Sequence, residues 1–100
     1  MHKLLALYRQ PRDLEAFEQH YQTVHVPLVR LIPGLQALIV NHGIAFPSGG
    51  EPTWYLVAEL HFAGEASFHE AMGSAENRAV GKDLRGFAGE LATLMARRSD

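Results

Sequence analysis

The stretch Trp54-Tyr55-Leu56-Val57-Ala58-Glu59-Leu60-His61-Phe62 decides the fold of this chain of 100 residues. Large apolar residues recur at every second position, which is the period of a β-strand with one buried face. The apolar set is Trp54, Leu56, Ala58, Leu60 and Phe62, and we expect it to pack against helices. The alternate set is Tyr55, Val57, Glu59 and His61, and we expect it to face the other side of the sheet.

Three shorter runs also predict strands, because they are rich in apolar and β-branched residues and are bounded by glycine, proline or polar residues. These runs are residues 3–9, 35–42 and 91–97. The segment 43–52 contains three glycines and two prolines, which is typical of a loop.

Two helical regions separate the strands. Asp13 is the expected N-cap of the first helix, because its carboxylate can accept from a free backbone N–H. The apolar face of this helix would consist of Leu14, Phe17, Tyr21, Val24 and Leu28. Pro27 lacks an N–H and disfavours helical geometry before it, so we expect the helix to end near His25. The second region would begin at Glu65, break at Gly73 and restart with Ser74 as a cap.

The order strand, helix, strand, strand, helix, strand predicts one ferredoxin-like α+β domain over residues 1–100. Two right-handed β-α-β units side by side give a four-stranded antiparallel sheet with both helices on one face. The uncovered face would carry Val57 and other apolar groups, too many to leave in water. We therefore expect a homodimer in which two sheets face each other as an α+β barrel, with a cavity that suits a small apolar or aromatic metabolite.

Composition excludes several classes of function. The net charge is −2 and the basic residues are scattered, which argues against nucleic-acid binding. The chain has no cysteine, so it has no disulfide, no thiolate metal site and no thiol nucleophile. The sequence has neither an apolar run long enough to cross a membrane nor a signal peptide. We therefore expect a cytoplasmic location and no membrane partner.

Several motifs in register resemble the EthD family. The motifs are Tyr8-Arg9-Gln10-Pro11, Phe17-Glu18-Gln19-His20-Tyr21, His25-Val26-Pro27-Leu28-Val29, Ile32-Pro33-Gly34-Leu35, Ala58-Glu59-Leu60-His61-Phe62 and Asp83-Leu84-Arg85-Gly86-Phe87. They run in the family's order from about residue 3 to residue 97. His61 departs from the pattern, because tryptophan is usual there.

The resemblance implies a dimeric α+β barrel and a role in catabolic or secondary metabolism. The family is named for its association with the degradation of ethyl tert-butyl ether, and other members look like cofactor-free dehydratases or cyclases. A cofactor-free lyase or isomerase is the first hypothesis for this chain. A non-catalytic accessory module that binds a ligand is the second, and a haem-dependent or cofactor-free monooxygenase is the third.

His25 and Glu59 are the candidate catalytic residues. Imidazole suits proton transfer near neutral pH, and His25 would turn past the helix end towards the open end of the barrel. The alternative is a histidine that only caps the helix. A carboxylate in an apolar strand such as Glu59 could act as an acid or base, or could form a salt bridge with Arg9 or Lys3.

Tyr55, His61 and His42 are the candidate substrate-binding residues, on the polar alternate faces of their strands. They could orient a ligand by hydrogen bonds, or they could be interface residues with one polar tip. No metal site is expected, because no His-Glu-x-x-His motif occurs and His20 and His25 are five residues apart. No cofactor is expected for the first hypothesis.

Overall fold

The computed structural model describes residues 1–44, 47–50 and 53–98, and it has the predicted order of strands and helices. The elements are β1 (His2–Tyr8), α1 (Leu14–His20), η1 (Tyr21–His25), α2 (Val26–Val29), β2 (Ala37–Ile44), β3 (Trp54–Phe62), α3 (Glu65–Met72), α4 (Ala75–Ala88) and β4 (Ala92–Arg98). Within the expected loop 43–52, Gly43 and Ile44 belong to β2 instead, and residues 45, 46, 51 and 52 lie outside the described residues.

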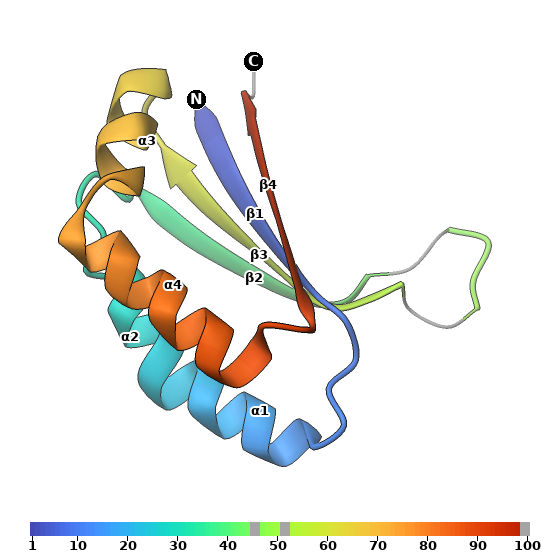
Figure 1. Ribbon diagram of the computed structural model, residues 1–100. Helices are drawn as coiled ribbons and strands as arrows, with labels where there is room; N and C mark the ends of the chain where they lie inside the picture. Colours follow the sequence, from blue (N-terminus) through green and yellow to red (C-terminus); the bar gives the residue numbers. More distant parts are fainter. Residues whose placement is uncertain (45–46, 51–52, 99–100) are drawn as a thin grey trace.

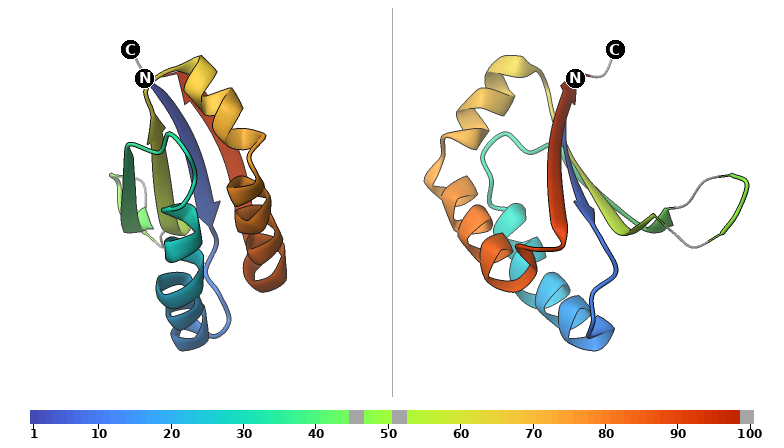
Figure 2. Two further views of the ribbon diagram at one scale, coloured as in Figure 1. Left: turned by 90° about the vertical axis from the view of Figure 1, so that its left-hand side faces the viewer. Right: turned by 45° about the vertical axis from the view of Figure 1, so that its right-hand side comes forward.

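The four strands form one antiparallel sheet in the order β2-β3-β1-β4 (Figure 1). In the described part of the chain the helices lie on one face of this sheet, and the other face carries no helix there (Figure 2). This arrangement is the ferredoxin-like α+β fold expected from the sequence.

The central strand β3 has the predicted pair of faces from Leu56 to Phe62. At its start the prediction is wrong, because Trp54 is only half-buried and Tyr55 contacts Glu18 and Phe17 of α1 on the helix side. Leu56, Ala58, Leu60 and Phe62 are all buried in the core beneath the helices. Glu59 lies on the opposite face, where it pairs in register with Leu5 of β1 and Ile39 of β2. The alternation therefore predicted the orientation of this strand from Leu56 onwards.

The predicted helix caps are also present. The Asp13 carboxylate accepts a hydrogen bond from the Ala16 backbone N–H at 3.0 Å. Ser74 Oγ accepts from the Asn77 N–H at 3.1 Å and starts α4, directly after Gly73, the C-cap of α3. Each side chain satisfies one N–H that has no partner within the first turn of its helix.

The expectation that Pro27 ends the first helix is wrong. The chain passes from α1 through one π-helical turn, η1, into α2, and Pro27 lies within the first turn of α2. In η1 the hydrogen bonds span five residues instead of four, as in the bond from the Val26 N–H to the Tyr21 carbonyl. The wider turn accommodates a residue that would otherwise break the α-helical bonding pattern.

The π turn also changes which side chains are buried. Phe17, Tyr21, His25 and Val29 form the core stripe, at a constant spacing of four residues. Val24 and Leu14 were expected in the core, but both are 41% exposed. A regular α-helix of 3.6 residues per turn would rotate a four-residue repeat away from the sheet, and the wider π turn corrects this rotation. His25 is therefore a core residue.

Candidate functional site

An apolar cavity of about 120 Å³ lies between the sheet and the helices. We expected a cavity on the other side, between two sheets, and this position differs from that expectation. Its walls come from all four strands and from η1, α2, α3 and α4. Residues that line it include Leu4, Ala6, Tyr8, Tyr21, His25, Val29, Leu38, Ala58, Leu60, Met72, Val80, Gly81, Leu84 and Leu94.

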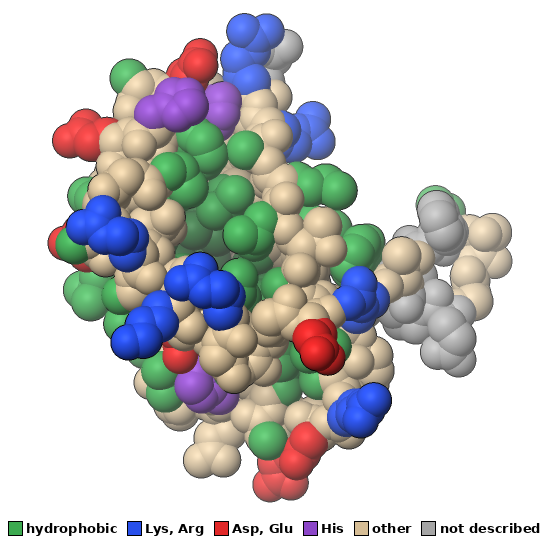
Figure 3. Space-filling view, viewed as in Figure 1, with side chains coloured by type: hydrophobic (Ala, Val, Ile, Leu, Met, Phe, Trp, Pro, Cys, Tyr) green, Lys and Arg blue, Asp and Glu red, His purple; other side chains and the backbone are tan. Residues whose placement is uncertain are grey.

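Small residues leave this space empty. Ala6 of β1 and Ala58 of β3 are directly paired in the middle of the sheet, and Gly81 of α4 contributes no side chain above them. Larger residues, among them Tyr8, Tyr21 and Leu60, line the rest of the cavity wall. Figure 3 shows a hollow with hydrophobic walls between the helices and β4, with Lys and Arg side chains at its margin.

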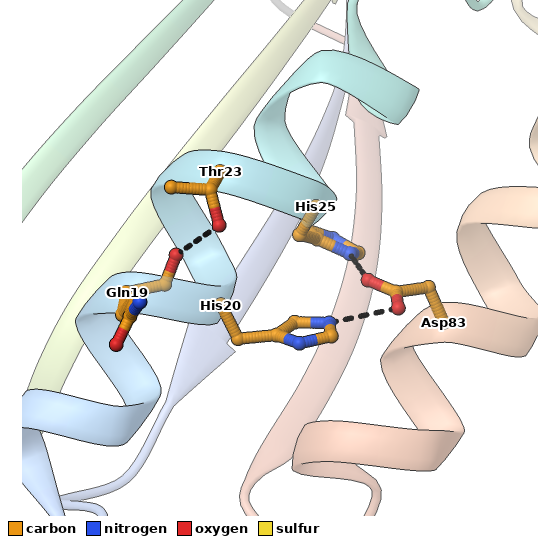
Figure 4. Close-up of polar contacts among 5 residues, drawn as sticks. All are labelled: Gln19, His20, Thr23, His25 and Asp83. Carbon is orange, nitrogen blue, oxygen red and sulfur yellow. Dashed lines mark hydrogen bonds and ion pairs between the residues drawn. The ribbon is translucent and has the colours of Figure 1, made fainter.

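His25 lies in the wall of the cavity and is held by Asp83 of α4. Nδ1 of His25 is 2.9 Å from Oδ2 of Asp83, and His25 is only 4% exposed (Figure 4). The imidazole also stacks on the Tyr21 ring, with centroids 5.6 Å apart, and contacts the Phe87 ring at 5.0 Å. Its position is therefore fixed by both packing and a hydrogen bond.

The environment favours a neutral His25 beside an ionised Asp83. Burial lowers the pKa of His25, even though the adjacent carboxylate favours the protonated ring. Burial alone would raise the pKa of Asp83, but hydrogen bonds from His25 and His20 outweigh it and hold this pKa below its ordinary value. In this charge state Nδ1 of His25 carries the proton and donates to Asp83. Nε2 then keeps its lone pair and can act as a base.

Two buried tyrosines line the same cavity. Tyr8 and Tyr21 are each 1% exposed, and their rings meet edge to face with centroids 5.7 Å apart. Burial raises the pKa of Tyr21 to about 12 and that of Tyr8 well above its usual range, with the Asp83 charge adding to the effect on Tyr8. Both hydroxyls therefore stay protonated at neutral pH and are suited to donate to an oxygen of a ligand.

The predicted site residues do not come together in one site. Tyr55 and His42 lie at one end of the sheet, where both donate to Oε1 of Glu18 in α1, His42 from Nε2 at 2.8 Å. The two donors outweigh the effect of burial and lower the pKa of Glu18. His42 is paired in register with Leu56 and reaches the helix side, so its expected place on the same sheet face as His61 is wrong. The side chains of Tyr55, His42 and Glu18 do not line the cavity.

Glu59 and His61 form a separate group on the sheet face without helices. Nε2 of His61 is 3.2 Å and Nζ of Lys3 is 3.5 Å from Oε1 of Glu59. These neighbours, His61 first, lower the pKa of Glu59. The structure thus contains the salt bridge between Glu59 and Lys3 that was the alternative to a catalytic Glu59. Of the five candidate residues, His25 alone lines the cavity.

Sequence reasoning missed Asp83, Tyr8 and Tyr21 as parts of the site. Tyr8 and Asp83 both stand in the quoted EthD-like motifs, and Tyr21 was placed in the core without a chemical role. Only pairing in space could single out Asp83, because 58 residues separate it from His25. Within residues 1–44, 47–50 and 53–98, no group of three or more His, Asp or Glu side chains could hold a metal ion.

The cavity does not fit the haem of the third hypothesis. Pockets for drug-sized ligands have volumes of about 300–1,000 Å³, whereas this cavity has about 120 Å³. In volume it is closer to an engineered cavity of about 150 Å³ that binds benzene.

Among the described residues, no helix is long and apolar enough to span a membrane.

Fold and site together define a ferredoxin-like α+β domain with a buried histidine–aspartate pair beside an apolar cavity. The chain belongs to the EthD family, because the model of the EthD domain matches residues 9–90. The chain is also similar to an EthD family protein from Bacillus halodurans, with 42% identity and a TM-score of 0.91. That alignment covers 100% of this chain and 99% of the other.

More distant structures share the fold alone. A dimeric ferredoxin-like protein of unknown function from Thermobifida fusca has 14% identity and a TM-score of 0.69, with 98% of this chain and 90% of the other covered. A hydroxynitrile lyase from Passiflora edulis has 11% identity and a TM-score of 0.76, with 99% and 93% covered. At such identities a fold does not determine the chemistry.

Proposed function

We propose that this chain binds a small, mostly apolar molecule in the cavity and catalyses a cofactor-free proton transfer on it, as a lyase or isomerase. The observation that carries the proposal is the pair of His25 and Asp83 at 2.9 Å in the cavity wall. A neutral, buried imidazole with one nitrogen engaged by a carboxylate and the other free is the arrangement of a general base.

In this mechanism Nε2 of His25 takes a proton from the substrate. The imidazole becomes an imidazolium, whose charge Asp83 stabilises, and the substrate becomes an anion. The hydroxyls of Tyr8 and Tyr21 donate to the oxygen on which the negative charge develops. His25 then returns the proton to a different atom of the substrate in an isomerisation, or to the leaving group in a lyase reaction.

The proposed ligand is small and contains an oxygen acceptor. A cavity of about 120 Å³ accommodates a molecule similar in size to benzene, and its walls are mostly hydrocarbon. The hydroxynitrile lyase from Passiflora edulis supports the view that this fold can host a lyase reaction on a small molecule.

We also propose a homodimer through the sheet face that carries no helix. One row across this face consists of Ile39, Glu59, Leu5 and Met95, in which Ile39 is 42% and Met95 is 52% exposed. Lys3 and His61 compensate the single carboxylate of the row. Burial of this face against a second copy would remove its apolar groups from water, and the dimeric protein from Thermobifida fusca supports this assembly.

Deuterium exchange tests the catalytic proposal. The molecule that copurifies with the chain would be identified by mass spectrometry and incubated in D₂O with the protein. Wild type should exchange one substrate proton, as measured by ¹H NMR, and His25→Gln should bind the molecule without exchanging it. Binding without exchange in wild type would overturn the catalytic proposal in favour of a ligand-binding accessory module.

A further inference from the structure

Asp83 holds a second histidine besides His25. Nε2 of His20 lies 2.8 Å from Oδ1 of Asp83, while Nδ1 of His25 lies 2.9 Å from Oδ2 (Figure 4). Each carboxylate oxygen therefore accepts one imidazole N–H. The two histidines come from the same continuous helix, in which His20 is the last residue of α1 and His25 the last residue of η1, and the aspartate comes from α4.

The two histidines differ in their access to water. The side chain of His20 is 34% exposed and lines an open groove, whereas that of His25 is 5% exposed and lines the cavity. Phe87 lies between the two environments, with its ring centroid 4.4 Å from that of His20 and 5.0 Å from that of His25. The three side chains of His20, Asp83 and His25 thus connect the cavity wall to the surface.

We propose that His20 is a positioning residue that completes a His20–Asp83–His25 unit, in which the exposed imidazole balances the carboxylate so that the buried one stays neutral. This inference rests on the proposed function, because it assigns His20 a role in supporting the base of that same site.

A proton on this unit is more stable on the exposed ring of His20 than on the buried ring of His25. Asp83 contributes one negative charge, which favours a proton on either imidazole. A cation is better solvated at His20 than in the apolar wall at His25, because taking a charge out of water is costly. A protonated His20 compensates the carboxylate and reduces its pull on a second proton, so Nε2 of His25 keeps its lone pair. His20 also fixes the carboxylate plane, since rotation of Asp83 would break one bond or the other.

The other ionisable groups near this unit, among the described residues, include two tyrosines and four charged side chains. Tyr8 of β1 and Tyr21 of η1 have raised pKa values and remain neutral. The groove beside His20 contains two guanidinium groups and two carboxylates. These are Arg12, Arg85, Asp13 and Glu90. Asp83 is hydrogen-bonded to both imidazoles, so the proposal predicts that a charge on one ring disfavours a charge on the other.

Histidine titration by NMR tests the proposal without a substrate. Ring ¹⁵N and ¹H signals would be followed from pH 4 to pH 9 in wild type and in His20→Gln, which can still donate to Asp83 but carries no charge. We expect the midpoint of His25 to move to higher pH in His20→Gln. The matched control His69→Gln removes an exposed histidine that lies 3.4 Å from Glu65 and contacts the Phe68 ring, and it should leave His25 unchanged.

Asp83→Asn provides a second measurement should His20→Gln fold poorly. Loss of the carboxylate should shift the titration of both rings together to lower pH. A titration of His25 that is the same in wild type and His20→Gln, or a shift of only one ring in Asp83→Asn, would overturn the proposal. These readouts do not depend on turnover, so a coupled unit in a protein without deuterium exchange would refute the catalytic proposal alone.

Discussion

Nδ1 of His25 donates to Oδ2 of Asp83 at 2.9 Å, although the two residues lie 58 positions apart on opposite helices. This hydrogen bond determines which nitrogen of His25 is free, because a carboxylate can only accept. With Nδ1 protonated, Nε2 of this buried histidine can act as a base in the proposed reaction.

Asp83→Asn should lower the rate of the proposed deuterium exchange by about 10²- to 10⁴-fold. The amide of asparagine can donate to Nδ1, which moves the ring proton to Nε2 and removes the base. Asp13→Asn is the matched control, because asparagine caps a helix as well as aspartate does. A rate in Asp83→Asn equal to that of the control would show that the carboxylate has no role in the reaction.

The free energy of unfolding should fall as the pH drops below about 6.5. Burial lowers the pKa of His25 in the folded protein below its ordinary value of 6.5, so the unfolded chain binds this proton first. The contribution is complete above pH 6.5 and is lost on acidification, with a slope of up to about 1.4 kcal/mol per pH unit. Urea unfolding between pH 5 and pH 8 measures it.

His25→Gln supplies the comparison for this pH dependence. Glutamine does not titrate, so the slope between pH 5 and pH 6.5 should become shallower in the variant. An unchanged slope would mean that another group accounts for the acid sensitivity. At lower pH the protonation of Asp83, whose pKa is also lowered, should destabilise wild type more than His25→Gln, because the variant lacks the imidazole of His25 that helps to lower this pKa.

Gly81→Ala should stabilise the fold and weaken binding in the cavity. Alanine in a helix interior gains about 0.5–1 kcal/mol over glycine, and the nearest side-chain atom to the new Cβ is Nη1 of the flexible Arg85, at 3.3 Å. The same Cβ narrows the cavity. Benzene, titrated by NMR, is a suitable probe of that loss.

Gly86→Ala separates the two effects. Gly86 also lies within α4 but does not line the cavity, and nothing lies within 4 Å of a Cβ built there. This variant should gain a similar amount of stability with unchanged benzene binding. If both variants bound benzene like wild type, the cavity would not be the ligand site.

Leu5→Glu should convert the proposed dimer into a monomer. Leu5 pairs in register with Glu59 in the centre of the sheet face that carries no helix, so the variant places two carboxylates side by side there. Leu31→Glu serves as a control on the helix side, because Leu31 is 65% exposed. Light scattering at micromolar concentration measures the mass. A monomeric wild type would contradict the proposed assembly.

Glu59→Leu should change the free energy of unfolding by less than about 1 kcal/mol. The carboxylate and its partner Lys3 are each about a quarter exposed, and such ion pairs contribute little net stability. Because Glu59 does not line the cavity, deuterium exchange should also persist. Loss of exchange in a folded Glu59→Leu variant would restore this residue as a catalytic candidate and place the reaction at the other sheet face.

The sequence by itself determined the fold and the orientation of its strands. The alternation from Leu56 to Phe62 assigned one face to the core and the other to Glu59, because successive side chains in a strand point in opposite directions. Asp13 and Ser74 marked two helix starts, since capping is a local interaction within three residues. Both kinds of signal act over short stretches of chain.

Only the tertiary structure decided the site. The π turn moved burial from Val24 to His25, because a small rotation of the helix is set by packing against the sheet and not by the local pattern. The cavity arises where Ala6, Ala58 and Gly81, from three distant segments, meet without large side chains. The partnership of His20, His25 and Asp83 has the same origin: pairing between side chains 58 and 63 positions apart depends on how two helices pack, which no local pattern encodes.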